Sequence, residues 1–215
     1  GSRVSADPED LKRASARAAL SFVESGMVLG LGTGSTVRHL LELLGAALRS
    51  GALSDIVGVP TSLQTEARAR EEGIDLVELG RGGFPDLTID GADEVSPELD
   101  LVKGMGGALL REKMVAQASR RVVIIADRGK LVDRLGTRSP LPVEVIEWGL
   151  RSHVAFLESE GAAVSVRSSA EGVPVRSDLP LHDLTGGNAW VSAVLASADR
   201  KSTRLNSSHS SVSRM

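Results

Sequence analysis

The most informative part of the chain is Asp86–Glu94, DLTIDGADE, which is followed closely by Leu101–Lys113, LVKGMGGALLREK. The apolar run Leu87–Ile89 predicts a short buried strand. Two carboxylates come directly after this strand, and a lysine, a glycine-rich turn and a further glutamate come soon after them. Residues of these types, gathered beyond the end of a buried strand, are typical of an enzyme site.

Strands and helices alternate on both sides of this stretch. The helix signals are a capping Asp7 before Pro8, apolar residues at helical spacing from Val37 to Leu48, and an Ala/Arg/Glu-rich segment that reaches Glu72. We expect the first helix to end near Glu24. Further strands are expected at 27–31, 56–59, 76–79 and 122–126. This alternation predicts an α/β fold, Rossmann-like, with a mostly parallel sheet and helices on both faces.

The pattern changes at Leu141. A strand (141–146), a helix (147–160) and two strands (163–167 and 173–176) predict a smaller α+β domain. The expected division is therefore a Rossmann-like domain at 3–137, a partial α+β domain at 138–198 and a tail at 199–215.

The tail at 199–215 has six serines in seventeen residues and little apolar surface to bury, which predicts disorder. The segment Asp199–His209 also looks like the translation of a sequencing-adapter oligonucleotide, so we interpret the tail as artefactual.

Composition excludes several classes of protein. The 215 residues carry a formal charge of -3, only 2% are aromatic, and basic residues are not clustered, which argues against binding of nucleic acid. There is no cysteine, hence no disulfide and no thiolate metal site. No apolar stretch approaches the roughly 20 residues of a membrane span. We expect a cytoplasmic protein without membrane partners.

The glycines in Gly30–Thr36, GLGTGST, lie between a predicted strand and a predicted helix. Backbone amides and the helix dipole favour an anion there, and the hydroxyls of Thr33, Ser35 and Thr36 suit a phosphate monoester. A dinucleotide site would need glycine at position 35 and an acid at the end of the next strand, so NAD is not expected. A turn needed only for backbone geometry explains the glycines about equally well.

Asp90 and Asp93 come after an apolar strand, at the edge where open parallel sheets bind ligands. Either aspartate alone would be a turn residue or a helix cap, but the pair with Lys103 nearby favours a functional site. The apolar residues before Lys103 predict a sheltered ammonium that could stabilise an oxyanion.

Glu112 shares a helical stripe with Leu109, Ala116 and Ser119, which predicts a carboxylate that faces inward. Desolvation there should raise its pKa and suit a base that works near neutral pH.

Other polar residues are less informative. Lys130 follows another buried strand on the ligand side, whereas Glu144 alternates with valines and is expected on the exposed face of a strand. The four histidines show no metal-ligand spacing, so no metal and no cofactor are expected.

Four ordered motifs carry a family resemblance: Gly30–Thr36, Asp86–Lys113, Ile124–Lys130 and Leu141–Val145. Together they resemble the type A ribose-5-phosphate isomerases over roughly residues 7 to 178. The resemblance implies reversible isomerisation of D-ribose 5-phosphate and D-ribulose 5-phosphate through an enediolate, in the non-oxidative pentose phosphate pathway. It also implies a homodimer or homotetramer.

The resemblance further assigns roles to residues. Glu112 would be the proton acceptor, Asp90 would move hydroxyl protons and assist ring opening, and Lys103 would steady the enediolate oxygens, with Asp93 as the fourth catalytic residue. The substrate would be bound by Thr33, Gly34, Ser35, Thr36, Asp90, Gly91, Ala92, Asp93, Lys103, Gly104, Met105, Gly106 and Lys130. Met105 stands where many members have Gly or Arg.

Two other interpretations stay open. A sugar-phosphate-binding sensor could keep the glycine turn without chemistry, but it would not need Glu112. Because the family pattern is lost after about Asp178, where relatives continue through another helix and strand, we also expect a truncated second domain, and an inactive chain is the third possibility.

Overall fold

The computed structural model describes residues 7–146, 148–168, 170, 188–195 and 212–214, the last two ranges by their backbone alone. The chain forms two compact units. The first unit comprises Gly1–Gly91 and Arg111–Lys130, and the second comprises Ala92–Leu110 and Leu131–Met215. The expected division at 3–137 and 138–198 stays a prediction.

The first unit is built on a five-stranded sheet in which every strand pair is parallel. Its order is β3-β2-β1-β4-β7, so the direction in which strands are added reverses between β1 and β4. Open α/β sheets bind ligands at the carboxyl ends of the strands at such a reversal. The predicted α/β class is confirmed. The strands are β1 (Val28–Leu31), β2 (Val57–Pro60), β3 (Asp75–Leu76), β4 (Leu87–Gly91) and β7 (Val122–Ile125).

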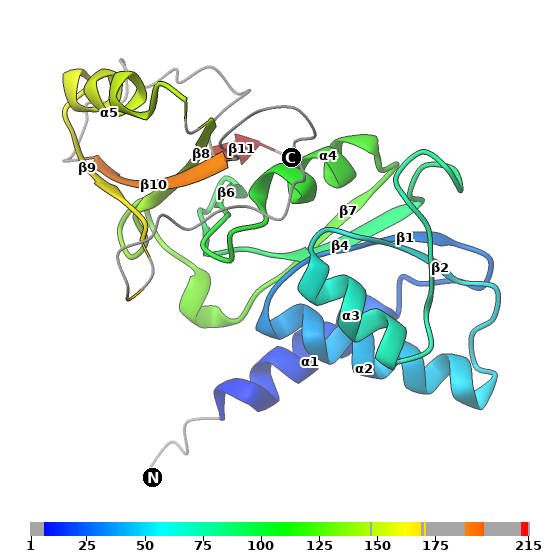
Figure 1. The fold of residues 1–215 in the computed structure, drawn as a ribbon. Coiled ribbons are helices and arrows are strands. Elements are labelled where there is room, and N and C mark those ends of the chain that lie inside the picture. The colour runs from blue at the N-terminus through cyan, green and yellow to red at the C-terminus, as the bar shows by residue number, and fades with distance from the viewer. Residues whose placement is uncertain (1–6, 147, 169, 171–187, 196–211, 215) are drawn as a thin grey trace, which may run out of the picture. The chain divides into compact units, whose positions relative to one another are not determined.

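Helices cover both faces of this sheet (Figure 1). On one face lie α1 (Pro8–Leu20), α2 (Ser35–Ser50) and α3 (Leu63–Glu71); on the other lies α4 (Leu109–Ala118), which belongs to the first unit from Arg111 onward. The core beneath α1 and α2 is aliphatic, as the low aromatic content requires. Its most buried side chains include Leu29, Leu31, Leu40, Leu44 and Ile89.

Local capping chemistry sets the helix ends. The Asp7 side chain accepts a hydrogen bond from the Glu9 amide (3.0 Å), and Pro8 occupies the first turn, as predicted. However, α1 ends at Leu20 and not near Glu24. The hydroxyl of Ser21 donates to the Ala18 carbonyl (2.7 Å), and the amides that follow bond three residues back, which tightens the chain and ends the helix.

The second unit contains two small antiparallel sheets. One pairs β5 (Glu94–Val95) with β6 (Asp100–Val102) and β6 with β11 (Val212–Arg214). The other has the order β8-β10-β9, and α5 (Leu150–Ser159) packs on it through Leu157. Its strands are β8 (Leu141–Ile146), β9 (Ala162–Val166) and β10 (Asn188–Leu195).

Several predicted elements differ from the structure. The third parallel strand is β3 at Asp75–Leu76, not 76–79. The helix predicted from 147 begins at Leu150 because Gly149 adopts a left-handed conformation (φ 79°). The strand predicted at 173–176 lies outside the described residues. The hairpin of β5 and β6 and the long strand β10 were not predicted. In the tail predicted to be disordered, Val212–Arg214 form a strand, and 199–211 lie outside the described residues.

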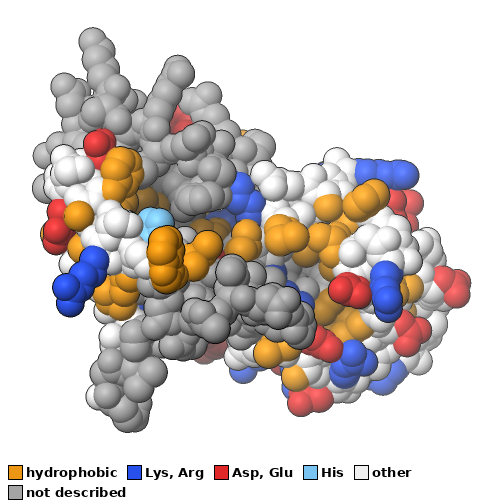
Figure 2. Space-filling view, turned by 45° about the horizontal axis from the view of Figure 1, so that its top comes forward, with side chains coloured by type: hydrophobic (Ala, Val, Ile, Leu, Met, Phe, Trp, Pro, Cys, Tyr) orange, Lys and Arg blue, Asp and Glu red, His pale blue; other side chains and the backbone are white. Residues whose placement is uncertain are grey.

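The surface mixes charged and apolar side chains. On the face in Figure 2, Lys and Arg side chains of the described residues alternate with Asp and Glu and form no continuous basic patch.

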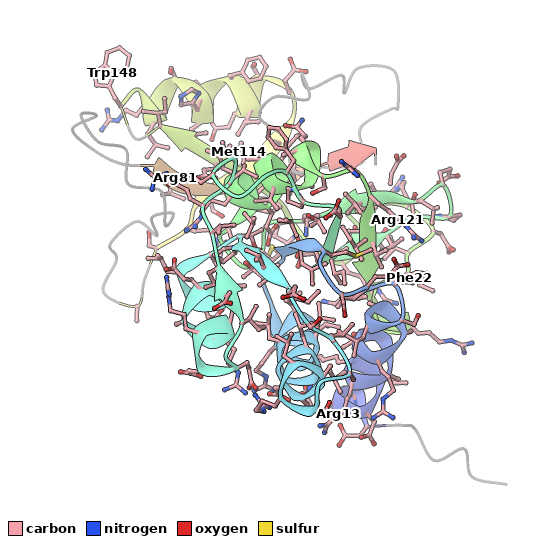
Figure 3. The ribbon with its side chains drawn as sticks, turned by 90° about the vertical axis from the view of Figure 1, so that its right-hand side faces the viewer. Arg13, Phe22, Arg81, Met114, Arg121 and Trp148 are labelled. Carbon is pink, nitrogen blue, oxygen red and sulfur yellow. The ribbon has the colours of Figure 1, made fainter. Side chains whose placement is uncertain are left out.

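Trp148 projects into solvent (Figure 3) and is 85% exposed. Where β7 begins near the end of α1, the Arg121 guanidinium stacks on the Phe22 ring at 4.6 Å. Within the described ranges, no helix is long and apolar enough to cross a membrane.

Glu9 in the first turn of α1 should make stability depend on acid pH. The hydrogen bond that Lys12 donates (2.6 Å), and then the contact with His39 Nε2 (2.8 Å), lower the pKa of Glu9 from 4.5 to about 2. A lowered folded-state pKa stabilises the fold above the unfolded-state pKa, and this stabilisation is lost as pH falls from about 4.5 towards 2.

We therefore expect Glu9→Gln to lower the melting temperature slightly at neutral pH, and the difference from the parent to vanish near pH 2. Thermal unfolding followed by circular dichroism across this range measures it. The exposed residue Glu24 offers a control, Glu24→Gln. A difference for Glu9→Gln that stays constant with pH would contradict the assignment.

Candidate active site

Two glycines, one in β1 and one in the turn after it, let this part of the chain approach β4 closely. A Cβ at Gly30 would lie 1.8 Å from the Thr88 hydroxyl oxygen, and a Cβ at Gly32 would lie 2.2 Å from Asp90 Oδ1. Neither position has room for a side chain. The close contact with β4 therefore requires glycine at positions 30 and 32. The sequence analysis explained these glycines by anion binding or by the geometry of the turn and did not include this contact.

The third glycine starts α2. Gly34 is the N-cap residue with φ 118°, a conformation that favours glycine, and no side chain caps this helix. Ser35 is exposed and Thr36 half-buried, and the first turn carries no acidic residue. A helix start without a side-chain cap or an acidic residue favours an anion, and binding of a phosphate here stays a prediction.

Asp90 lies at the carboxyl end of β4 and is 1% exposed. Its Oδ1 accepts hydrogen bonds from the amides of Thr33 (3.1 Å) and Gly91 (2.7 Å). This carboxylate oxygen therefore joins the turn after β1 to the end of β4, beside the hydrogen bond from the Gly32 amide to the Ile89 carbonyl (3.0 Å). The two bonds to Oδ1 fix the orientation of the carboxylate next to the start of α2.

Glu112 lies in the first turn of α4 and is 4% exposed, so the predicted inward orientation is confirmed. Because α4 connects the parallel strands β4 and β7, it runs antiparallel to them, and its first turn lies at their carboxyl ends. One turn further on, the Val115 side chain occupies the space that a Cβ at Gly30 would need. Asp90, Glu112 and the amino end of α2 thus share one edge of the sheet.

Lys130 ends a short 3₁₀ helix (Arg128–Lys130) that follows β7. Its amide donates to the Asp127 carbonyl (3.0 Å), and Asp127 Oδ1 accepts a hydrogen bond from the Gly129 amide (2.6 Å). The lysine is half-buried. It therefore follows the carboxyl end of another parallel strand, as the sequence predicts.

The second unit holds the remaining predicted site residues on and beyond the hairpin of β5 and β6. The Asp93 amide donates to the Val102 carbonyl (2.8 Å), and Asp93 Oδ2 accepts a hydrogen bond from the Met105 amide (3.0 Å). Lys103 is 6% exposed, which confirms its predicted shelter. Asp93 therefore holds the glycine-rich turn directly beyond Lys103.

Sequence patterns did not predict one buried carboxylate of this unit. Glu94 is 0% exposed; its Oε1 accepts hydrogen bonds from the amides of Arg138 (2.6 Å) and Ser139 (2.7 Å), and its Oε2 accepts one from Gly136 (2.6 Å). Its partners lie more than forty residues away in the chain, so no local pattern could have found them. Glu94 holds the loop that leads into β8.

The predicted substrate-binding residues fall into two groups. The first unit brings one group to the edge of its parallel sheet: Thr33, Gly34, Ser35, Thr36, Asp90, Gly91 and Lys130. The second unit holds the other group around its hairpin: Ala92, Asp93, Lys103, Gly104, Met105 and Gly106. Among the described residues, no three His, Asp or Glu side chains are placed to hold a metal ion.

Comparison with known proteins is decisive for the family. Residues 57–181 match the family model of ribose 5-phosphate isomerase A (phosphoriboisomerase A). The chain belongs to the ribose 5-phosphate isomerase A family. The resemblance predicted from its motifs is thus confirmed.

Relatives in this family match most of the length of the chain. Ribose-5-phosphate isomerase A of Rhodopseudomonas palustris (strain TIE-1) is 58% identical over 185 residues, 86% of this chain and 78% of the relative. That of Chloroflexus aurantiacus is 52% identical over 170 residues, 79% of this chain and 71% of the relative.

Solved structures share the fold. Ribose 5-phosphate isomerase A of Methanocaldococcus jannaschii superposes with a TM-score of 0.81 at 35% identity and covers 90% of this chain and 83% of its own. A D-ribose-5-phosphate isomerase in complex with phospho-erythronic acid gives a TM-score of 0.82 at 38% identity and covers 88% and 80%.

Glu94→Gln should destabilise this isomerase-family chain. A carboxamide has one acceptor oxygen, so its NH₂ group must face at least one of the three backbone donors. Leaving a buried group unsatisfied costs about 1–3 kcal/mol of unfolding free energy. Urea denaturation measures this cost, with Glu98→Gln on the exposed turn of the same hairpin as the control. Equal stability of the two variants would show that Glu94 does not stabilise the loop that leads into β8.

Proposed function

We propose that this chain interconverts D-ribose 5-phosphate and D-ribulose 5-phosphate, with Glu112 as the base that moves a proton between C2 and C1. Its activity is that of a ribose-5-phosphate isomerase, an aldose-ketose isomerase of the pentose phosphate pathway. The observation that carries the assignment of roles is the placement of a buried glutamate, a buried aspartate and an uncapped helix terminus at one sheet edge.

The substrate phosphate is assigned to the start of α2. The backbone amides of its first turn lie at the positive end of the helix dipole. Neither a side-chain cap nor an acidic residue offsets this positive charge. The hydroxyls of Ser35 and Thr36 add donors, and Lys130 supplies a cation from the end of β7. Binding by these groups holds the open-chain sugar with its carbonyl end towards the acidic residues.

The chemical step moves one proton along the substrate. Glu112 removes the proton from C2 of the aldose, and the bonding electrons pass through the C1–C2 bond to the carbonyl oxygen to give an enediolate. Glu112 then returns a proton to C1 as the hydroxyl proton on O2 moves to O1. General base catalysis of this kind contributes about 10²–10⁴ in rate.

Asp90 and Lys103 complete the proposed chemistry. Asp90 is held by two backbone amides and moves hydroxyl protons during ring opening and transfer between O1 and O2. The ammonium of Lys103 stabilises the negative enediolate oxygens, supported by its burial, because Coulomb attraction is stronger away from water. Asp93 holds the Met105 amide, so the turn beyond Lys103 keeps its backbone donors in place.

Glu112→Gln tests the base directly. The substitution keeps size and hydrogen-bonding capacity but removes the basic carboxylate, so kcat should fall by about 10²–10⁴ while substrate binding persists. The interconversion rate and the affinity for ribose 5-phosphate from calorimetry measure the two effects.

The matched control is Glu158→Gln, an exposed glutamate on α5, which should turn over like the parent. If Glu112→Gln kept normal turnover, Asp90 would become the candidate base. A parent chain that bound ribose 5-phosphate without converting it would favour the sensor interpretation.

We also propose a homodimer or homotetramer in the cytoplasm. Large hydrophobic side chains at the surface, including Phe84 (65% exposed) and Leu99 (69% exposed), are supporting observations, since such side chains are common at contacts between subunits. Light scattering coupled to size-exclusion chromatography should give two or four times the chain mass of 22.5 kDa, and a monomer at micromolar concentration would contradict this.

A further inference from the structure

Four hydroxyl side chains meet beneath the turn that follows β1. This hydroxyl cluster consists of Thr33 in the turn, Thr61 and Ser62 after β2, and Thr65 in α3. Thr61, Ser62 and Thr65 are 0–4% exposed. The reaction proposed above uses none of these three residues. Burying a hydroxyl group costs free energy unless the group is hydrogen-bonded.

The hydroxyl protons of the cluster can be followed from donor to acceptor. Thr65 donates to the Gly32 carbonyl (2.7 Å), and Thr61 donates to the Leu31 carbonyl (2.9 Å). Ser62 donates to Thr65 Oγ1 (3.0 Å).

Thr33 has one hydroxyl proton, and its possible acceptors are Ser62 Oγ (2.9 Å), Thr61 Oγ1 (2.8 Å) and Thr65 Oγ1 (3.4 Å). Because a hydroxyl donates only one hydrogen bond, none is left for the Thr33 side chain to give a phosphate.

The same turn is held from its other side by Asp90. The Thr33 amide donates to Asp90 Oδ1 (3.1 Å), while Thr65 holds the carbonyl of the preceding residue, Gly32. The peptide between Gly32 and Thr33 is therefore bonded at both its carbonyl and its N–H group. Its plane fixes the direction in which the chain enters Gly34 and starts α2.

We propose that Thr65 is a positioning residue for the phosphate site and that Thr33 serves that site through its backbone. Thr65 orients the Gly32–Thr33 peptide, and thereby the first amides of α2, without touching the substrate. This inference rests on the proposed binding of phosphate at the start of α2.

Thr65→Val tests the proposal because it keeps the branched shape and removes only the hydroxyl. We expect the KM for ribose 5-phosphate and the inhibition constant for inorganic phosphate each to rise about tenfold, with a smaller change in kcat. Thr65→Ser restores the hydroxyl and should return both constants to within about twofold of the parent.

The control is Ser25→Ala, which removes another side-chain hydroxyl of the first unit. Ser25 accepts a hydrogen bond from the Ser54 amide (3.0 Å) before the amino ends of β1 and β2, at the opposite end of the sheet from the turn. It should lower the melting temperature but leave the phosphate inhibition constant unchanged. A Thr65→Val variant that lost stability alone, with both constants normal, would show a merely structural role and overturn the proposal.

A double variant, Ser35→Ala with Thr36→Val, separates this proposal from the phosphate assignment. If the double variant weakens phosphate inhibition and Thr65→Val does not, the positioning role is wrong and the phosphate site stands. If neither weakens it, the phosphate is bound elsewhere and the positioning role fails with it.

Discussion

The contact between the turn after β1 and the end of β4 is the constraint on which the proposed site depends. Gly32 lies so close to Asp90 that a side chain at position 32 would fall 2.2 Å from Oδ1, and the Thr33 amide donates to that same oxygen (3.1 Å). The contact links the carboxylate to the loop that starts α2. A displacement of either strand would therefore alter both the orientation of Asp90 and the direction of the helix amides.

Sheet topology brings the other groups to the same edge. The strand order reverses between β1 and β4, and the helices that precede or follow parallel strands run against them, so α2 and α4 both begin at the carboxyl ends. Glu112 is in the first turn of α4 and Lys130 comes just after β7. The start of α2, the end of β4, the start of α4 and the residues after β7 therefore lie at one edge of the same sheet. Strand and helix direction is enough to bring them there, although they are separated by up to about a hundred residues.

Local sequence pattern was enough to predict part of this arrangement. The α/β class, the burial of Glu112 and the start of α1 follow from periodicity and capping, which are properties of neighbouring residues. Strand register is not local: Gly30 faces Thr88 only because β1 pairs with β4, so its steric role could not be deduced. The same holds for Glu94 and the hydroxyl cluster, whose partners are distant in the chain. The roles of the site residues stay predictions.

The most direct test of this site is a crystal structure of the Glu112→Gln variant with ribose 5-phosphate bound, since that variant should bind the sugar and turn it over slowly. We expect phosphate oxygens within hydrogen-bond distance of the Ser35 and Thr36 amides, and substrate hydroxyls beside Asp90. A phosphate bound away from the start of α2, or a sugar whose C1 and C2 lie far from position 112, would contradict this expectation.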